Sequence, residues 1–481
     1  MRNVLLVLSC AACVVLALSA SGHAQPAVPQ PPDGAAAYEA TPRPTDGENM
    51  VLTVRKLREG FDPPRPLLIW AIGSSFTNGL GNGDRLKALI AERFPDAPEI
   101  VYRKQAGSST SYHFCRGWAQ HLVIPDQPDV VLIYNFGNPD DLEQLIVELR
   151  RGTTADIIVG TLHWVQPQKG VWPDPDAPTT HQDFAAMREM SKKYGVEFVE
   201  NRRELTEYML KNNLVVDDLL GDSVHQTRFA ADCTVQNIAR HFHAAARGND
   251  KPEQRERRVG AASDAVKLDG AWSPAAGGAT RQTNNGRVSL QFTGNRIDLI
   301  GRRRPDGGKA RVLIDGIPAG ELPVFHAGYV QPAKENALQP PMAPRDRSPH
   351  RVDLGPAKDL VPQEWTITMT SDEGNYELTG SVTGADGRGN AFQPFTSVSG
   401  QILIDPAFWR AAKTNRTGDR FTFEVYRSTV GEVDFAGPES EHFRIRLAQA
   451  LSNATHTLEL IAAGDGPIEI VAFDVFEPPL K

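Results

Sequence analysis

The chain has 481 residues, of which 51 are Lys or Arg and 59 are Asp or Glu, giving a formal net charge of −8. This length exceeds what one ordinary hydrophobic core supports, so two domains are expected. The mild acidity and the lack of a basic run in the sequence argue against nucleic acid as the main partner.

The N-terminus has the pattern of a secretory signal peptide. Arg2 precedes an apolar run over residues 4–18, and the small residues Gly22 and Ala24 precede a suitable cleavage site. The run is shorter than the roughly 20 apolar residues that a membrane span requires. We therefore expect removal of residues 1–24, export to the periplasm or the extracellular space, and no stable membrane insertion.

Residues 25–49 follow as a segment rich in Pro and Ala, without apolar periodicity, and this composition predicts a mobile linker. Beyond the signal peptide only Cys115 and Cys233 remain. In an exported protein they can form one disulfide, but two separate buried thiols are equally compatible with the sequence, which does not give their separation.

Residues 50–248 alternate short apolar runs with helical stretches. Asp84 can cap the helix that follows it, and Leu142 begins a second apolar helical stripe. Because the strands are apolar on consecutive residues, they fit a parallel sheet buried on both faces. The pattern predicts a three-layer α/β/α domain. The expected strands are PLLIWAIG, EIVYRK, DVVLIYNFG, DIIVGTLHWV and VEFVE.

Residues 257–479 change to alternating apolar and polar runs separated by Gly, Asn and Asp. This pattern is typical of antiparallel strands and predicts a jelly-roll-like β-sandwich, a candidate carbohydrate-binding domain. Segments 326–350 and 371–397 are poor in apolar residues and rich in Pro or Gly, so they are expected to be long loops.

Two short patterns in the first domain carry candidate chemistry. Ser75 directly follows the strand PLLIWAI, where parallel sheets place their ligand chemistry. Asp222 and His225 lie three residues apart just before a helix, so the carboxylate can bind one ring nitrogen while the other faces a hydroxyl. Either pattern alone also fits an ordinary turn.

Together these patterns resemble the SGNH (GDSL) hydrolase family, whose first block is Gly-Asp-Ser-x-x-x-Gly and whose last block is Asp-x-x-His. The first block reads GSSFTNG from Gly73, with Ser74 in the position that is usually Asp. The resemblance covers residues 65–246 and implies Ser75 as nucleophile, His225 as general base and Asp222 as the residue that orients it.

The resemblance also implies an oxyanion hole. Its donors are the backbone N–H groups of Ser75 and Gly107 and the side-chain amide of Asn138. The third family block is imperfect, because Phe136 stands where the family has Gly, and a shift of register moves the asparagine role to Asn135.

The implied activity is esterase, acting most simply on O-acetyl groups of a polysaccharide or oligosaccharide, with no cofactor and no metal. His163 and Trp164 follow the next strand, and Trp172 and His181 lie in the loop after it. A Trp beside a polar group offers a stacking surface for a sugar ring, so these residues are candidates for the substrate wall. The alternative is that they pack within the loop.

Three other functions remain open at this stage. A glycosidase or polysaccharide lyase on the same scaffold can recruit His163, Asp140 and Asp141 for proton transfer. A lipid or thioester hydrolase would use the same Ser75. A binding protein without catalysis is favoured by Ser74 and the imperfect third block. The sequence does not indicate an oligomeric state.

Overall fold

The computed structural model describes residues 29–106, 110–177, 179, 182–243, 254–275, 280–329, 348–409 and 412–481. The expected signal peptide, Gly107 and His181 lie outside these ranges. Within the described ranges, no helix is both long and apolar enough to cross a membrane.

A five-stranded parallel sheet forms the centre of the first domain, in the order β2-β1-β3-β4-β5. Its strands are β1 (Leu67–Gly73), β2 (Ile100–Gln105), β3 (Val130–Tyr134), β4 (Asp156–Gly160) and β5 (Glu197–Val199). Strands β1, β3 and β4 are buried almost throughout, as expected for a sheet covered on both faces.

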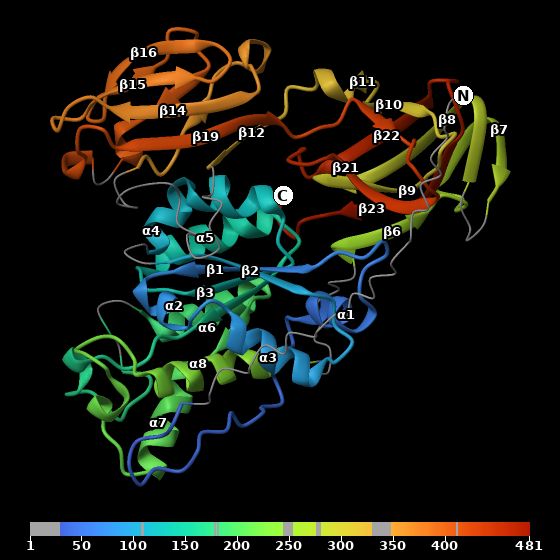
Figure 1. The fold of residues 1–481 in the computed structure, drawn as a ribbon. Coiled ribbons are helices and arrows are strands. Elements are labelled where there is room, and N and C mark those ends of the chain that lie inside the picture. The colour runs from blue at the N-terminus through green and yellow to red at the C-terminus, as the bar shows by residue number, and fades with distance from the viewer. Residues whose placement is uncertain are drawn as a thin grey trace, which may run out of the picture.

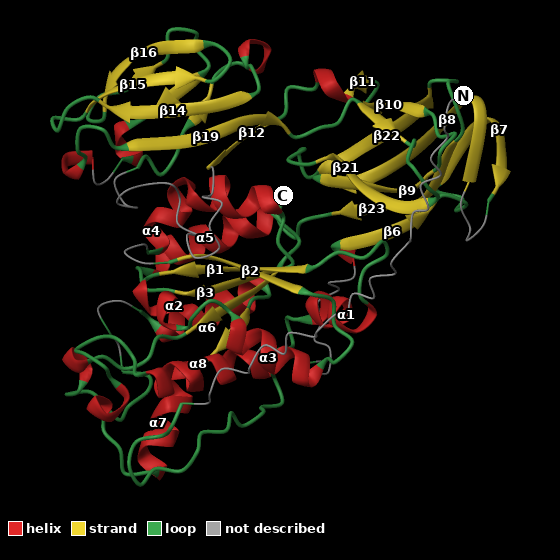
Figure 2. Cartoon of the chain, viewed as in Figure 1, coloured by secondary structure: helices red, strands yellow, loops and turns green. Residues whose placement is uncertain are grey.

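Helices cover both faces of this sheet (Figure 2). Alternate residues of β1 serve the two layers, since Trp70 and Ile72 pack in one apolar cluster and Ile69 and Ala71 in another. The first cluster contains residues of η1, α5 and α6, and the second contains residues of α1, α3 and α8. The helices are α1 (Val51–Glu59), α2 (Ser75–Gly79), α3 (Asp84–Arg93), α4 (Ser111–His113), the kinked helix η1 (Phe114–Val123), α5 (Pro139–Gly152), α6 (Phe184–Tyr194), α7 (Asn201–Lys211) and α8 (Arg228–Arg240).

The β-rich remainder forms two bodies (Figure 1). The large β body is a ten-stranded antiparallel arrangement, and the small β body combines a five-stranded sheet with a three-stranded one. The large body contains β6 (Glu256–Gly260), β7 (Val266–Pro274), β8 (Thr280–Gly294), β9 (Arg296–Arg303), β10 (Lys309–Ile314), β11 (Ile317–Pro318), β20 (Glu432–Asp434), β21 (Glu441–Ala448), β22 (Ala454–Ala462) and β23 (Ile468–Phe476).

The small β body is inserted between β11 and β20. Its strands are β12 (Phe325–Tyr329), β13 (Asp353–Leu354), β14 (Gln363–Met369), β15 (Asn375–Gly380), β16 (Gly384–Asn390), β17 (Phe395–Thr396), β18 (Ile402–Ile404) and β19 (Arg420–Arg427). The predicted fold class, an α/β/α domain followed by antiparallel β structure, is confirmed. The expectation of a long loop over residues 371–397 is wrong, because β15, β16 and β17 lie there. β16 has the sequence GADGRGN, and its backbone pairing with β15 holds it in the sheet despite the lack of large apolar side chains.

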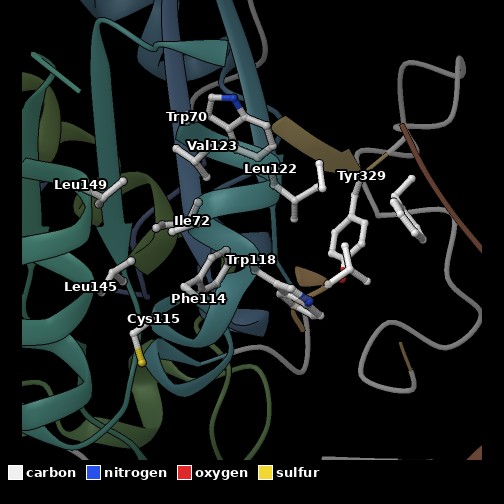
Figure 3. Packing of buried hydrophobic residues seen from close by; sticks show 14 of the residues in the cluster. Trp70, Ile72, Phe114, Cys115, Trp118, Leu122, Val123, Leu145, Leu149 and Tyr329 are labelled. Carbon is white, nitrogen blue, oxygen red and sulfur yellow. The ribbon is translucent and has the colours of Figure 1, made fainter. Parts of the chain in front are cut away.

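The small β body shares one apolar cluster with the first domain (Figure 3). Trp118 and Leu122 of η1 belong to the same cluster as Tyr329 of β12 and the sheet residue Ile72. His121 lies at this contact, where its Nδ1 is 2.5 Å from the carbonyl of Ala327. The two parts are therefore joined by continuous packing as well as by the chain.

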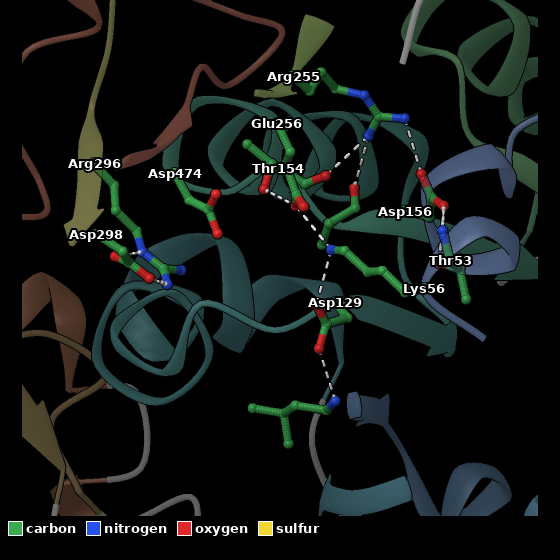
Figure 4. Close-up of polar contacts among 12 residues, drawn as sticks. Thr53, Lys56, Asp129, Thr154, Asp156, Arg255, Glu256, Arg296, Asp298 and Asp474 are labelled. Carbon is green, nitrogen blue, oxygen red and sulfur yellow. Dashed lines mark hydrogen bonds and ion pairs between the residues drawn. The ribbon is translucent and has the colours of Figure 1, made fainter. Parts of the chain in front are cut away.

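The large β body is joined to the first domain by buried ion pairs (Figure 4). Lys56 of α1 lies 2.8 Å from Asp129 and 2.8 Å from Glu256 at the start of β6. Arg255 lies 2.9 Å from Asp156, the first residue of β4. These contacts gather at the amino ends of the parallel strands.

The N-terminal segment is not a free linker over its described part. The Tyr38 hydroxyl donates a 2.5 Å hydrogen bond to Asn237 of α8, and Arg43 pairs with Glu204 of α7 at 2.6 Å. Asp46 is buried and pairs with Arg240. The expectation of mobility is wrong for residues 38–46, because their aromatic and charged side chains find partners on these two helices.

Candidate active site

A tight turn presents Ser75 directly beyond the carboxyl end of β1. A Cβ atom at Gly73 would lie 2.1 Å from Thr77 Oγ1 and 2.5 Å from the carbonyl oxygen of Tyr134, so only glycine fits at this close approach. Ser74 is fully buried, and its side chain accepts the N–H of Phe76 at 3.3 Å. This bond braces the start of α2, so a serine here stabilises the turn in which the family usually has Asp.

The two ends of the first domain meet at Ser75. His225 Nε2 lies 2.9 Å from Ser75 Oγ, and His225 Nδ1 lies 2.8 Å from Asp222 Oδ2. Thr227 caps α8 through the N–H of Ala230, which fixes the turn that carries both residues. Residues 150 positions apart in the sequence thus form one hydrogen-bonded chain.

Asp222 is held as a carboxylate by its own turn. Its Oδ1 accepts the N–H groups of Val224 at 2.8 Å and His225 at 2.7 Å. These two bonds, followed by the bond to the His225 side chain, lower the pKa of Asp222 to about 2. An ionised Asp222 favours the tautomer in which His225 Nδ1 carries the proton, so that Nε2 can accept the Ser75 hydroxyl hydrogen.

His163 packs beside the Asp222–His225 turn and holds it by a hydrogen bond. Its Nε2 lies 2.8 Å from the carbonyl oxygen of Val224, and its Nδ1 lies 2.9 Å from the Tyr134 hydroxyl. Its ring packs against Phe76 with centroids 4.8 Å apart. Burial lowers the pKa of His163 to about 4, so the ring is neutral near pH 7. It lies in the wall of the site, and both of its nitrogens are bound.

The side-chain amides of both candidate oxyanion asparagines bind protein groups. Asn138 caps α5, where its Oδ1 accepts the N–H of Asp141 and its Nδ2 donates to the carboxylate of the same residue. Asn135 is buried, and its Nδ2 donates to Ser111 Oγ at 3.3 Å. Neither lines the cavity at Ser75. Ser75 itself is the first residue of α2, so its N–H has no acceptor within the helix.

A cavity of about 500 Å³ opens beside Ser75 and His225. Apolar side chains dominate its wall, which suits a small organic ligand with few polar anchor points. The lining residues are Ser75, Phe76, Phe136, Leu162, His163, Val165, Pro167, Gln168, Val171, Thr179, Gln182, Arg202, Val224 and His225.

The predicted tryptophan walls do not line this cavity. Trp164 is buried, and its indole N–H donates to Thr206 Oγ1 at 2.8 Å. Trp172 packs edge-on against it with ring centroids 6.5 Å apart. Both belong to an apolar cluster with α7 and α8 residues, so they pack within the domain.

Sequence reasoning missed Phe76, Gln168, Gln182 and Arg202 as wall residues. A signal was available for Arg202, since it follows the strand VEFVE at the edge of the sheet where Ser75 lies.

The described residues offer no group of three or more His, Cys, Asp or Glu side chains that could hold a metal ion. Asp141 is 2.7 Å from Arg116, and Asp140 is exposed on α5. Cys115 and Cys233 are free and buried in different clusters, so the two thiols are separate.

Comparison with known proteins gives structural likenesses only. No protein-family model and no curated protein matches the sequence. A two-domain esterase (CEX) active on acetylated mannans matches at 12% identity and a TM-score of 0.33, covering 92% of this chain and 100% of that chain. The acetylxylan esterase Axe2 from Geobacillus stearothermophilus matches at 18% identity and a TM-score of 0.32, covering 38% of this chain and 97% of that chain. In these comparisons the chain is similar to carbohydrate esterases, in one case over most of its length.

Proposed function

We propose that the protein is an exported serine esterase that removes ester groups, above all O-acetyl groups, from a polysaccharide or oligosaccharide. The observation that carries the proposal is the unbroken chain from Asp222 through His225 to Ser75, with contacts of 2.8 and 2.9 Å. This arrangement is that of a nucleophile, a base and an orienting carboxylate.

The reaction follows from these positions. Ser75 Oγ attacks the ester carbonyl while its proton moves to His225 Nε2, and Asp222 stabilises the imidazolium that forms. His225 then gives the proton to the departing alcohol, leaving an acyl group on Ser75. Water attacks this acyl group with His225 again as base, which releases the acid and restores Ser75. The free N–H at the start of α2 is one donor for the oxyanion.

Ester hydrolysis is favoured over glycosidic cleavage by the composition of the cavity wall. Most glycosidases use two carboxyl groups flanking the scissile bond. The described residues that line the cavity include no Asp or Glu. His163, the other candidate for proton transfer, has both ring nitrogens bound to protein groups.

Two parts of the proposal, the sugar ester as substrate and the export of the protein, are supported by the sequence. The signal-peptide pattern of residues 1–24 supports export, and the resemblance of residues 65–246 to SGNH hydrolases, together with the appended β structure, supports action on an acylated glycan. The cavity of about 500 Å³ is in the size range of small-molecule sites.

The test is release of acetate from a panel of acetylated polysaccharides and from 4-nitrophenyl acetate. We expect the wild-type protein to release acetate and Ser75→Ala to release none above background. Ser263→Ala, in an exposed turn after β6, is the matched control and should behave as wild type. Full activity of Ser75→Ala would refute the mechanism.

A further inference from the structure

One wall residue of the cavity is a cation that has no counter-charge among the described residues. Arg202, the second residue of α7, is 2% exposed and lines the same cavity as Ser75 and His225. Burial lowers the pKa of Arg202 to about 10, so the guanidinium stays charged at neutral pH.

The hydrogen bonds of Arg202 go to neutral groups. Nε donates to the carbonyl of Leu162 at 3.3 Å, and Nη2 donates to the carbonyl of His163 at 3.4 Å and to Gln168 Oε1 at 3.0 Å. Nη1 has no partner among the described residues. Arg202 Cζ lies over the Trp164 ring, 4.2 Å from its centroid, and over the Phe184 ring, 4.6 Å from its centroid, so two aromatic rings pack on the guanidinium.

The neighbouring Arg203 has the ion pairs that Arg202 lacks among the described residues. Arg203 lies 2.8 Å from Asp176 and 3.5 Å from Glu200. The described part of the chain gives Arg202 no such ion pair. Buried charges in proteins are normally paired, because removing an ion from water is costly. Stacking on two aromatic rings offsets part of that cost but supplies no negative charge.

We propose that a carboxylate on the substrate supplies the counter-charge of Arg202, so that the enzyme selects esters that also carry a carboxylate. The inference rests on the proposed function and names its substrate class. The carboxylate can belong to an acidic sugar or to a dicarboxylic acyl group, and both offer the same ligand chemistry to a guanidinium edge.

The cavity leaves few other anchors for such a group. Both ends of the Gln182 side-chain amide are hydrogen-bonded, because Oε1 accepts the N–H of Leu162 and Nε2 donates to the carbonyl of Asn135. Gln168 Oε1 accepts from Arg202, and because a carboxylate needs donors, this oxygen does not compete with the guanidinium for the ligand. Ser75 and Arg202 line the same cavity. The proposed substrate therefore places its ester at Ser75 and its carboxylate at Arg202.

Two matched substrate pairs test this inference and separate the two sources. The first pair is mono-4-nitrophenyl succinate and its methyl ester, and the second is an O-acetylated methyl glucuronoside and its methyl ester. In at least one pair we expect kcat/KM to favour the acid by about tenfold or more, mainly through KM, as for a charged hydrogen bond. The pair that shows the preference identifies the source of the carboxylate.

The variant Arg202→Gln should bring the ratio of acid to neutral ester to about one or below, whatever its absolute rates. Arg203→Gln, on the same helix, is the control and should keep the wild-type ratio. If Arg202→Gln fails to fold, inhibition of the wild-type enzyme decides, since glucuronate or succinate should then inhibit about tenfold more strongly than the corresponding amide.

Different results would contradict the role of Arg202 and the proposed esterase function. Hydrolysis of the neutral esters without any preference, a preference that survives in Arg202→Gln, or equal inhibition by acid and amide would overturn the role of Arg202 alone. A wild-type protein that hydrolyses neither member of either pair would contradict the proposed esterase function, and the inference with it.

Discussion

The charged groups at the two ends of the parallel sheet differ in burial and in the number of their hydrogen-bond partners. At the amino ends, Asp129 accepts hydrogen bonds from Lys56, from Arg65 and from the N–H of Leu68, all at 2.8 to 2.9 Å. At the carboxyl ends, His225 and Asp222 are 45% and 56% exposed, and their chain of contacts ends at a single hydroxyl. Buried, fully paired charges hold domains together, whereas exposed and partly committed ones are available for chemistry.

This comparison predicts that changes at the two ends are separable. Changes to the exposed residues His225 and Asp222 at the carboxyl end should remove activity and leave stability nearly intact. Changes at the amino end should lower stability and leave the folded fraction active.

The largest effect is expected for His225→Ala. Without the imidazole no base takes the Ser75 proton, so kcat should fall by about 10⁴ to 10⁶. Steady-state hydrolysis of 4-nitrophenyl acetate measures the loss, and thermal unfolding should show a change in stability below about 1 kcal/mol. A variant within tenfold of wild type would remove His225 from the mechanism.

A smaller effect is expected for Asp222→Asn. The imidazole keeps some basicity, but its tautomer and its protonated form lose their support, so kcat should fall by about 10³ to 10⁴. The same assay ranks the two variants. If Asp222→Asn proved more damaging than His225→Ala, the assigned order of roles would be wrong.

At the amino end, Asp129→Asn should act on stability. Removing this charge leaves Lys56 and Arg65 without their shared partner, which costs about 3 to 5 kcal/mol for a buried pair. Urea unfolding measures the loss, and kcat per folded molecule should be unchanged. Asp84→Asn is the control, because its pair with Lys87 is exposed and contributes below about 1 kcal/mol. Equal stability of the two variants would contradict a structural role for Asp129.

The contributions of His163 and Asp129 to stability should be lost in different pH ranges. The pKa of His163 is lowered to about 4, so its contribution is present above pH 6.5 and is lost as the pH falls toward 4, by about 2 to 3 kcal/mol. The pKa of Asp129 is also depressed, chiefly by Lys56 and Arg65 against the opposing effect of burial, so its contribution is lost only below about pH 4.

Urea unfolding between pH 7 and pH 4 can isolate the histidine contribution. His163→Gln should reduce the decline in stability over this range, since one titrating ring is gone. Burial also lowers the pKa of His121 and of His326 to about 4, so these two rings keep the rest of the decline. An identical decline in the wild type and the variant would assign the acid sensitivity to other groups.

The positions of Ser75, Asp222 and His225 could be inferred from the sequence because their signals are local. Ser75 directly follows a strongly apolar strand, and the other two residues share one turn before a helix. The parallel sheet was equally accessible, since strands such as β3 are apolar on every residue. Each of these patterns lies within one short segment, and the resemblance to the SGNH family is what brings Ser75 and His225 together.

The rest of the site depends on partners distant in sequence. Trp164 is absent from the cavity lining, and its N–H is bound by Thr206, 42 residues later. Asn138 caps a helix through Asp141, which a family pattern does not reveal. Arg202 enters the cavity wall through carbonyls of the loop after β4, 39 and 40 residues earlier in the chain. No periodicity or motif spacing encodes such contacts.

The small β body shows a further limit of sequence patterns. β15 alternates buried Tyr376 and Leu378 with less buried neighbours, but its partner β16 is rich in Gly and lacks apolar alternation. Gly389 is required there because a Cβ would lie 2.5 Å from the Tyr376 ring. Because its glycines make room for a neighbouring aromatic ring, such a strand has a sequence that looks like that of a loop.

Covalent labelling tests whether Ser75 is a nucleophile that His225 activates. The full-length mature protein is treated with a fluorophosphonate, and the modified residue is located by peptide mass spectrometry. We expect one label, on Ser75, and strongly slowed labelling in His225→Ala, because the hydroxyl then lacks its base. Labelling at another serine, or labelling of Ser75 at an unchanged rate in His225→Ala, would contradict it.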